Sequence, residues 1–142
     1  MEAIRRRVTN TEQPKETEMK AAIVVMSDPQ ANSDEALGRV FNALGVAYDF
    51  KQNGDDVTVI FLGAGTRWAA QVTNADHPLH QLYKTVEDKV AGVSATCSDF
   101  FGAAGEAQQA GFAMLKDNDA PGTAGLPSLR ALAADGYQVM IF

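Results

Sequence analysis

The sequence predicts an α/β domain built on an open, mainly parallel sheet, and three observations lead to that class. Uninterrupted apolar runs at residues 21–26 and 57–62 are typical of strands buried on both faces. Amphipathic helical segments alternate with these runs, as the crossovers of a parallel sheet require. The 142 residues are 46% hydrophobic and 21% charged, a composition that supports one globular core.

The first half of the chain predicts a strand, a helix and a second strand. The strand at 21–26 ends at Ser27, and the polar residues 32–34 are good helix N-caps. The helix then runs to Asn53, where Gly54 favours its end. One apolar face is marked at helical spacing by Leu37, Val40, Phe41, Leu44 and Tyr48. The strand at 57–62 follows and stops at a glycine-rich turn.

The second half continues the same alternation. A short helix is expected at 67–72, and the clearest amphipathic pattern spans 79–90, after a cap at Asp76 and Pro78. The elements expected after it are a strand at 92–97, a helix at 100–110, a short strand at 112–115, a loop at 117–125, a helix at 127–135 and a last strand at 137–142. This order predicts a single domain over residues 20–142.

Charge argues against nucleic acid and membrane surfaces as partners of this domain. The chain has 12 basic and 18 acidic residues, a net charge of −6. The basic residues after residue 19 are scattered, whereas phosphate binding needs a clustered basic footprint. Residues 1–19 are polar and lack periodicity, so we expect a flexible N-terminal arm. Its Arg5–Arg7 run is compatible with RNA or an acidic partner, although a solvated tail is the simpler interpretation.

The single cysteine and the hydropathy pattern predict a cytoplasmic protein. One cysteine excludes an intramolecular disulfide framework. No apolar run approaches the roughly 18 residues that span a bilayer, and no apolar segment follows Arg5–Arg7 as it would in a signal peptide. His77 and His80 have a spacing compatible with a metal, but no third ligand is evident, so surface histidines and no metal or cofactor are expected.

Cys97 is the candidate catalytic residue. Ligands of open α/β sheets bind beyond the carboxyl ends of the strands, where we expect the loops at 27–34, 63–68 and 97–102 to meet. A thiol between a strand and a helix N-terminus is favoured as a thiolate, the nucleophile of sulfur transfer. The alternative is a cysteine buried in the core. Asp99 works against a thiolate if its carboxylate is close, or caps the helix.

Other residues in these loops are candidates for the mouth of a pocket around Cys97. Gly63 and Gly65 resemble a phosphate-binding turn, but Trp68 replaces the third glycine, so a plain tight turn is the better interpretation. Arg67 and Trp68 together suit a ligand or a partner, unless Trp68 closes the core beneath its own helix. The complete set of expected pocket-mouth residues is Asp28, Asn32, Gly63, Gly65, Arg67, Trp68 and Asp99.

The sequence resembles the DsrE-like superfamily, which includes DsrE, DsrF, the Tus proteins and YchN. The resemblance covers residues 20–142. The matching segments are the strand at 21–26, the helix through Ala36, Val40, Phe41 and Leu44, the strand at 57–63, the stretch at 95–103, and the C-terminal segments at 125–130 and 136–139.

The resemblance implies a three-layer α/β/α sandwich around a sheet of about five strands, assembled into trimers or hexamers. Some relatives carry sulfur as a persulfide on a cysteine at the position of Cys97. Relatives with this ending often have a Cys-x-x-Cys pair, whereas this chain has Ser94 at the first position, which excludes a dithiol switch within one subunit. They also tend to have histidine at the position of Leu126, so a possible base is missing.

Two functions from different classes remain open at this stage. One is a sulfur carrier or sulfur-relay protein that accepts and passes sulfane sulfur at Cys97, with donor or acceptor proteins as partners. The other is a non-catalytic oligomeric module that binds a small ligand or a protein. An exposed thiol that reacts at neutral pH would favour the first, and an inert Cys97 would favour the second.

Overall fold

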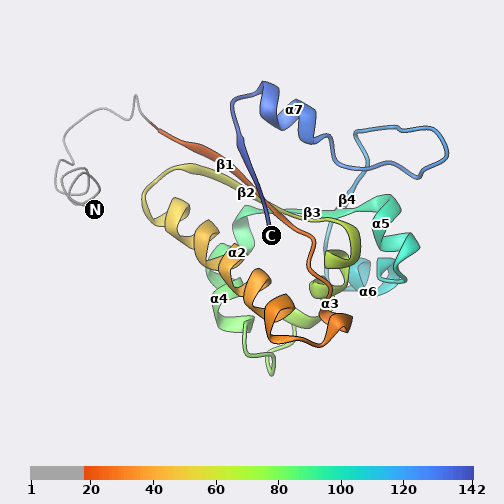
Figure 1. Cartoon of the computed structure of the whole chain (residues 1–142), viewed down its shortest axis with the longest axis horizontal. Helices are drawn as coiled ribbons and strands as arrows, with labels where there is room; N and C mark the ends of the chain where they lie inside the picture. The colour runs from red at the N-terminus through yellow and green to blue at the C-terminus, as the bar shows by residue number, and fades with distance from the viewer. Residues whose placement is uncertain (1–17) are drawn as a thin grey trace.

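The structure, a computed structural model, describes residues 18–142 and has an α/β fold with an open, all-parallel sheet flanked by helices (Figure 1). Five strands pair in the order β4-β3-β2-β1-β5. They are β1 (Lys20–Val25), β2 (Asp56–Phe61), β3 (Val90–Ser94), β4 (Met114–Leu115) and β5 (Gln138–Ile141). The expected fold class is confirmed, while Arg5–Arg7 and most of the expected arm lie outside the described residues.

The helices connect the parallel strands. They are α2 (Asp34–Gln52), α3 (Trp68–Val72), α4 (His80–Val86), α5 (Ala95–Phe100), α6 (Ala104–Gln109) and α7 (Leu129–Ala134). The described residues also form three short 3₁₀ helices, η2 (Pro29–Ala31), η3 (Gly63–Arg67) and η4 (Glu87–Lys89). The predicted cap of α2 is confirmed, because the Ser33 hydroxyl accepts a hydrogen bond from the Ala36 N–H at 3.1 Å.

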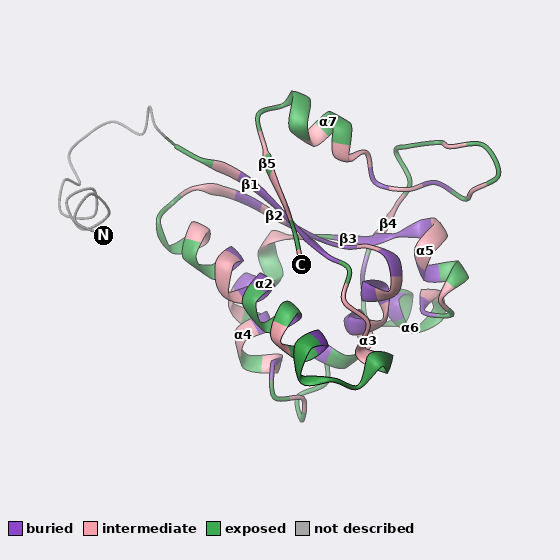
Figure 2. Cartoon of the chain, viewed as in Figure 1, coloured by how far each residue is buried: buried purple, intermediate pink, exposed green. Residues whose placement is uncertain are grey.

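Most of the core lies on one face of the sheet. There Ile23, Val59, Phe61 and Val93 point at α2, α3, α4 and α6, and Figure 2 shows the buried residues concentrated along these strands. The Phe61 ring meets the edge of Phe112 with centroids 5.9 Å apart. The burial of these apolar side chains away from water is the dominant stabilising contribution to the fold.

The opposite face of the sheet is covered more thinly. Figure 1 shows α7 on that side, and none of the α7 residues is buried. Met26 and Ile141, at the carboxyl ends of neighbouring strands, remain 43% and 58% exposed. The two helical layers are therefore unequal.

The predicted apolar face of α2 is only partly correct. Val40 and Leu44 are buried, but Leu37, Phe41 and Tyr48 are exposed. Alanines take the remaining buried positions of α2, namely Ala36, Ala43 and Ala47. Small side chains let the helix approach the sheet closely, so the buried stripe is rotated away from the larger residues.

Three further boundaries differ from the prediction. β3 ends at Ser94, so Cys97 lies inside α5 and not at the end of the strand. The helix expected at 100–110 begins only at Ala104, as α6, because α5 ends at Phe100 and Gly102, with a φ of +70°, breaks the helical path between the two helices. The amphipathic segment 79–90 supplies α4 only up to Val86, and Val90 already begins β3.

Candidate functional site

Cys97 lies on the first turn of α5, beyond the carboxyl end of β3. Ser94, the last residue of β3, caps the helix: its hydroxyl accepts a hydrogen bond from the Cys97 N–H at 3.3 Å. The Thr96 N–H donates to the Gly125 carbonyl at 2.9 Å, which ties this turn to the loop before α7. Cys97 is a free cysteine, and the residue is of intermediate burial. The alternative of a cysteine fully buried in the core therefore does not describe its position.

The three predicted loops meet at the carboxyl edge of the sheet through Arg67. The Arg67 Nη1 donates to both carboxylate oxygens of Asp28 at 3.1 and 3.2 Å. Its Nε donates to the Phe101 carbonyl at 3.1 Å, and the guanidinium lies 5.2 Å from the centroid of the Phe101 ring. We call Asp28, Arg67 and Phe101 the Arg67 cluster. It joins the loop after β1, the start of α3 and the end of α5.

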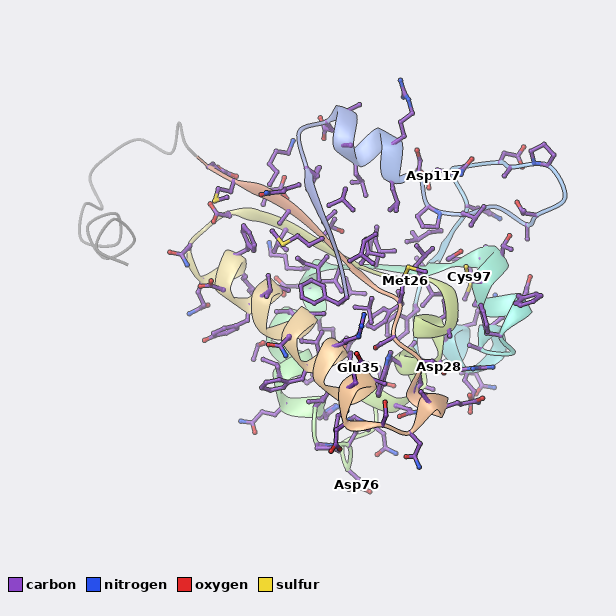
Figure 3. The ribbon with its side chains drawn as sticks, in the orientation of Figure 1. Met26, Asp28, Glu35, Asp76, Cys97 and Asp117 are labelled. Carbon is purple, nitrogen blue, oxygen red and sulfur yellow. The ribbon has the colours of Figure 1, made fainter. Side chains whose placement is uncertain are left out.

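The cluster borders a polar cleft of about 300 Å³. Among its lining residues are Gln30, Thr66, Arg67, Gln71, Phe101 and Glu106. Cys97 does not line this cleft, and Figure 3 shows it at the start of α5, apart from Asp28. The thiol and the Arg67 cluster are linked through α5, because the Phe101 N–H donates to the Cys97 carbonyl at 2.9 Å.

Trp68 belongs to the core and not to a pocket mouth. Its side chain is 3% exposed, and its Nε1–H donates to the Ser27 carbonyl at 2.8 Å. His77 packs edge-on against the indole, with centroids 6.0 Å apart. The alternative in which Trp68 closes the core beneath its own helix therefore describes its position.

The two glycines of the β2–α3 turn serve the backbone. A Cβ on Gly65 would lie 2.2 Å from the Val25 carbonyl oxygen, so only glycine allows η3 to pack this closely on the end of β1. Gly63 has a φ of +59°, in the left-handed region. Both glycines are buried, so the turn is a tight packing turn in this structure.

Asn32 and Asp99 lie at the periphery of the site. Asn32 ends η2 with a φ of 51°, a conformation that asparagine tolerates, and its side chain is exposed. Asp99 is exposed on α5, and the cap of that helix is Ser94. Of the predicted set, Asp28 and Arg67 are in direct contact.

Both histidines make hydrogen bonds to the backbone. Burial lowers the pKa of His77, whose Nδ1 accepts a hydrogen bond from the Leu79 N–H at 3.1 Å. The Nδ1 of His80 lies 2.8 Å from the Val72 carbonyl oxygen. Within residues 18–142, no group of three or more His, Cys, Asp or Glu side chains is placed to hold a metal ion.

Two parts of the site were missed by sequence reasoning. Ser94 has a recognisable signal, because a serine three residues before Cys97 at a strand end is a good N-cap. Phe101 contributes a backbone carbonyl and a ring face to Arg67. Nothing in the residue pattern distinguishes this phenylalanine from a core residue.

The chain belongs to the DsrE/DsrF-like family, whose family model matches residues 19–142. This confirms the resemblance drawn from the sequence. Neither the curated proteins nor the solved structures gave a match to this chain. Within the described residues, no helix has the length and apolar character needed to cross a membrane.

Proposed function

We propose that this DsrE/DsrF-like protein is a sulfur carrier that holds sulfane sulfur as a persulfide on Cys97. The observation that supports the proposal is the position of the thiol: it is free, partly exposed and held on a capped helical turn at the carboxyl edge of the sheet. Ligands of open α/β sheets bind at this edge. One thiol per subunit is sufficient for a relay.

The proposed loading step needs no external oxidant. The Cys97 thiolate attacks the outer sulfur of a donor persulfide, R–S–SH, and forms a new S–S bond. The S–S bond of the donor breaks, and the donor leaves as the thiolate R–S⁻. Delivery repeats the exchange in the other direction: an acceptor thiolate attacks the outer sulfur, and Cys97 leaves as the thiolate. A cytoplasmic, reducing compartment would keep the thiol available for this cycle.

Intact mass spectrometry tests loading. After incubation with glutathione persulfide, the native protein should gain about 32 Da, the mass of one sulfur atom. The Cys97→Ser variant, treated identically, should gain nothing. A folded native protein that stays unmodified contradicts the carrier. The non-catalytic binding module would then be favoured, and the polar cleft beside the Arg67 cluster would be its candidate ligand site.

We also propose that the protein acts as a homotrimer or homohexamer. Three large apolar residues on different elements support this assembly: Phe41 is 51% exposed, Ile141 is 58% exposed and Phe100 is 80% exposed. Closed symmetry would bury such surfaces between identical subunits. Size-exclusion chromatography with light scattering at micromolar concentration tests the assembly, and a monomer across that range contradicts it.

A further inference from the structure

Helix α7 lies over the thinly covered face of the sheet and leaves an apolar groove beneath it. The groove has a volume of about 410 Å³. Its floor is formed by residues of β2, β3 and β4, and its roof by α7 and residues before and after it. We define the α7 groove by its lining residues: Thr58, Ile60, Ala91, Leu115, Asp117, Pro127, Ser128, Ala131, Leu132 and Asp135.

The groove is held open because α7 is anchored at both ends. At its start, the Ser128 N–H donates to the Asp117 carboxylate at 3.2 Å, and Asn118 and Leu126 exchange backbone hydrogen bonds of 2.7 and 3.0 Å. Figure 3 shows Asp117 beside this end of the helix. At its other end, the Lys20 ammonium donates to the Asp135 carbonyl at 2.8 Å. Both ends of α7 are therefore held over the sheet by hydrogen bonds, and none of the residues of α7 is buried.

The charges in the groove select the chemistry of an occupant. The ionisable side chains that line it are both carboxylates, Asp117 and Asp135. The Asp135 carboxylate forms an ion pair with the Lys20 ammonium at 3.3 Å. Among the described residues, no ion pair of Asp117 is found. Lys116 and Arg130 are neighbours in the sequence but do not line the groove. The Lys20 ammonium offsets the charge of Asp135, so the carboxylate of Asp117 is the charge that favours a cation in the ligand.

We propose that the α7 groove binds a small amphipathic cation, such as an alkyl or aryl amine. The apolar body lies along Ile60, Leu115 and Leu132, and the ammonium group lies at the Asp117 end. The volume falls within the roughly 300–1,000 Å³ of small-molecule sites, which combine apolar walls with a few polar groups. The site requires no sulfur chemistry, so it stands or falls independently of the carrier function.

The test uses n-octylamine as the probe, with n-octanoate as an anion of equal chain length. Methyl resonances of Ile60, Leu115 and Leu132 in the full chain report where the probe binds. Octylamine should shift these resonances to saturation and bind at least about tenfold more tightly than octanoate. A tenfold ratio corresponds to a difference of about 1.4 kcal/mol between the binding free energies of the two probes. Equal affinity for the two probes, or shifts that do not saturate, would overturn the proposal.

Matched variants separate the groove from the rest of α7. Ala131→Phe places a ring in the groove and should abolish binding, whereas Ala133→Phe on the same helix should leave it unchanged, because Ala133 does not line the groove. Asp117→Asn keeps an oxygen for the Ser128 N–H and should weaken octylamine binding about threefold to tenfold, while Asp119→Asn should not. Equal effects within either pair contradict the assignment.

If a second copy of the chain covered the groove instead, Ala131→Phe would change the mass measured by light scattering, and that result would also overturn the proposal.

Discussion

Replacing Arg67 by methionine should destabilise the protein by about 2 kcal/mol. The substitution keeps a long apolar side chain and removes the guanidinium that joins three loops. Hydrogen bonds that involve charged groups contribute roughly 1.5–3 kcal/mol each, and fully exposed ion pairs roughly 0–1 kcal/mol. The Arg67 and Asp28 side chains are 23% and 34% exposed, between these limits. The bond from Nε to the Phe101 carbonyl adds a second contribution that methionine cannot replace.

Urea unfolding of a double-mutant cycle measures this contribution. Asp28→Asn keeps an acceptor for the Gln30 N–H, at 2.9 Å from Oδ1 in the native chain, and so removes mainly the charge. The coupling energy between Arg67→Met and Asp28→Asn should be about 1 kcal/mol. Arg39→Met is the control: Arg39 pairs with Glu35 on α2, and both side chains are more than half exposed, so its loss should cost less than about 0.5 kcal/mol. If Arg67→Met costs no more than this control, Arg67 does not hold the loops together.

Two other predictions concern the core and the tight turn. Burial, with a smaller contribution from the charge of Glu87, raises the pKa of Tyr83 from 10.0 to about 12. The native state therefore favours the neutral phenol, and the stability that this phenol contributes is lost as the pH rises from about 10 to 12. Tyr83→Phe should remove that part of the alkaline loss in urea titrations, Tyr48→Phe should retain it, and identical pH profiles for the two variants would contradict the assignment. Gly65→Ala should cost about 1–3 kcal/mol, because its Cβ would overlap the Val25 carbonyl oxygen. Gly38→Ala, with nothing within 4 Å of its Cβ, should stabilise α2 by about 0.5–1 kcal/mol, and a Gly65→Ala protein as stable as this control would refute the close packing.

The fold was predictable because its strands and caps carry local signals. The run at 21–26 has no polar interruption, and such a strand fits only a sheet covered on both faces. Ser33 marks the start of α2 by its side-chain chemistry alone. The orientation of α2 was less predictable. Ala43 and Ala47 are buried because their small side chains let the helix pack closely against the sheet, and hydrophobicity alone does not indicate this.

The location of the site at the carboxyl edge of the sheet was predictable from the sequence, but the contacts between its residues were not. Topology brings the three loops to one edge of the sheet, and that edge holds both Cys97 and Arg67. The contact of Arg67 with the Phe101 carbonyl depends on the break between α5 and α6 at Gly102, a tertiary feature that no local pattern specifies. Trp68 lies inside because its indole N–H finds an acceptor at Ser27, 41 residues earlier in the chain.

The most direct test of the carrier function is a complete cycle of loading and release on one sample. The protein is loaded with glutathione persulfide, freed of excess donor and then mixed with an acceptor thiol such as dithiothreitol, with the intact mass followed throughout. The carrier account predicts a gain of about 32 Da, its complete loss on addition of the acceptor and the appearance of sulfide from the reduced persulfide, with no change at any stage in Cys97→Ser. A native protein that never gains the mass, or that gains it and keeps it in the presence of the acceptor, would contradict a carrier function for Cys97.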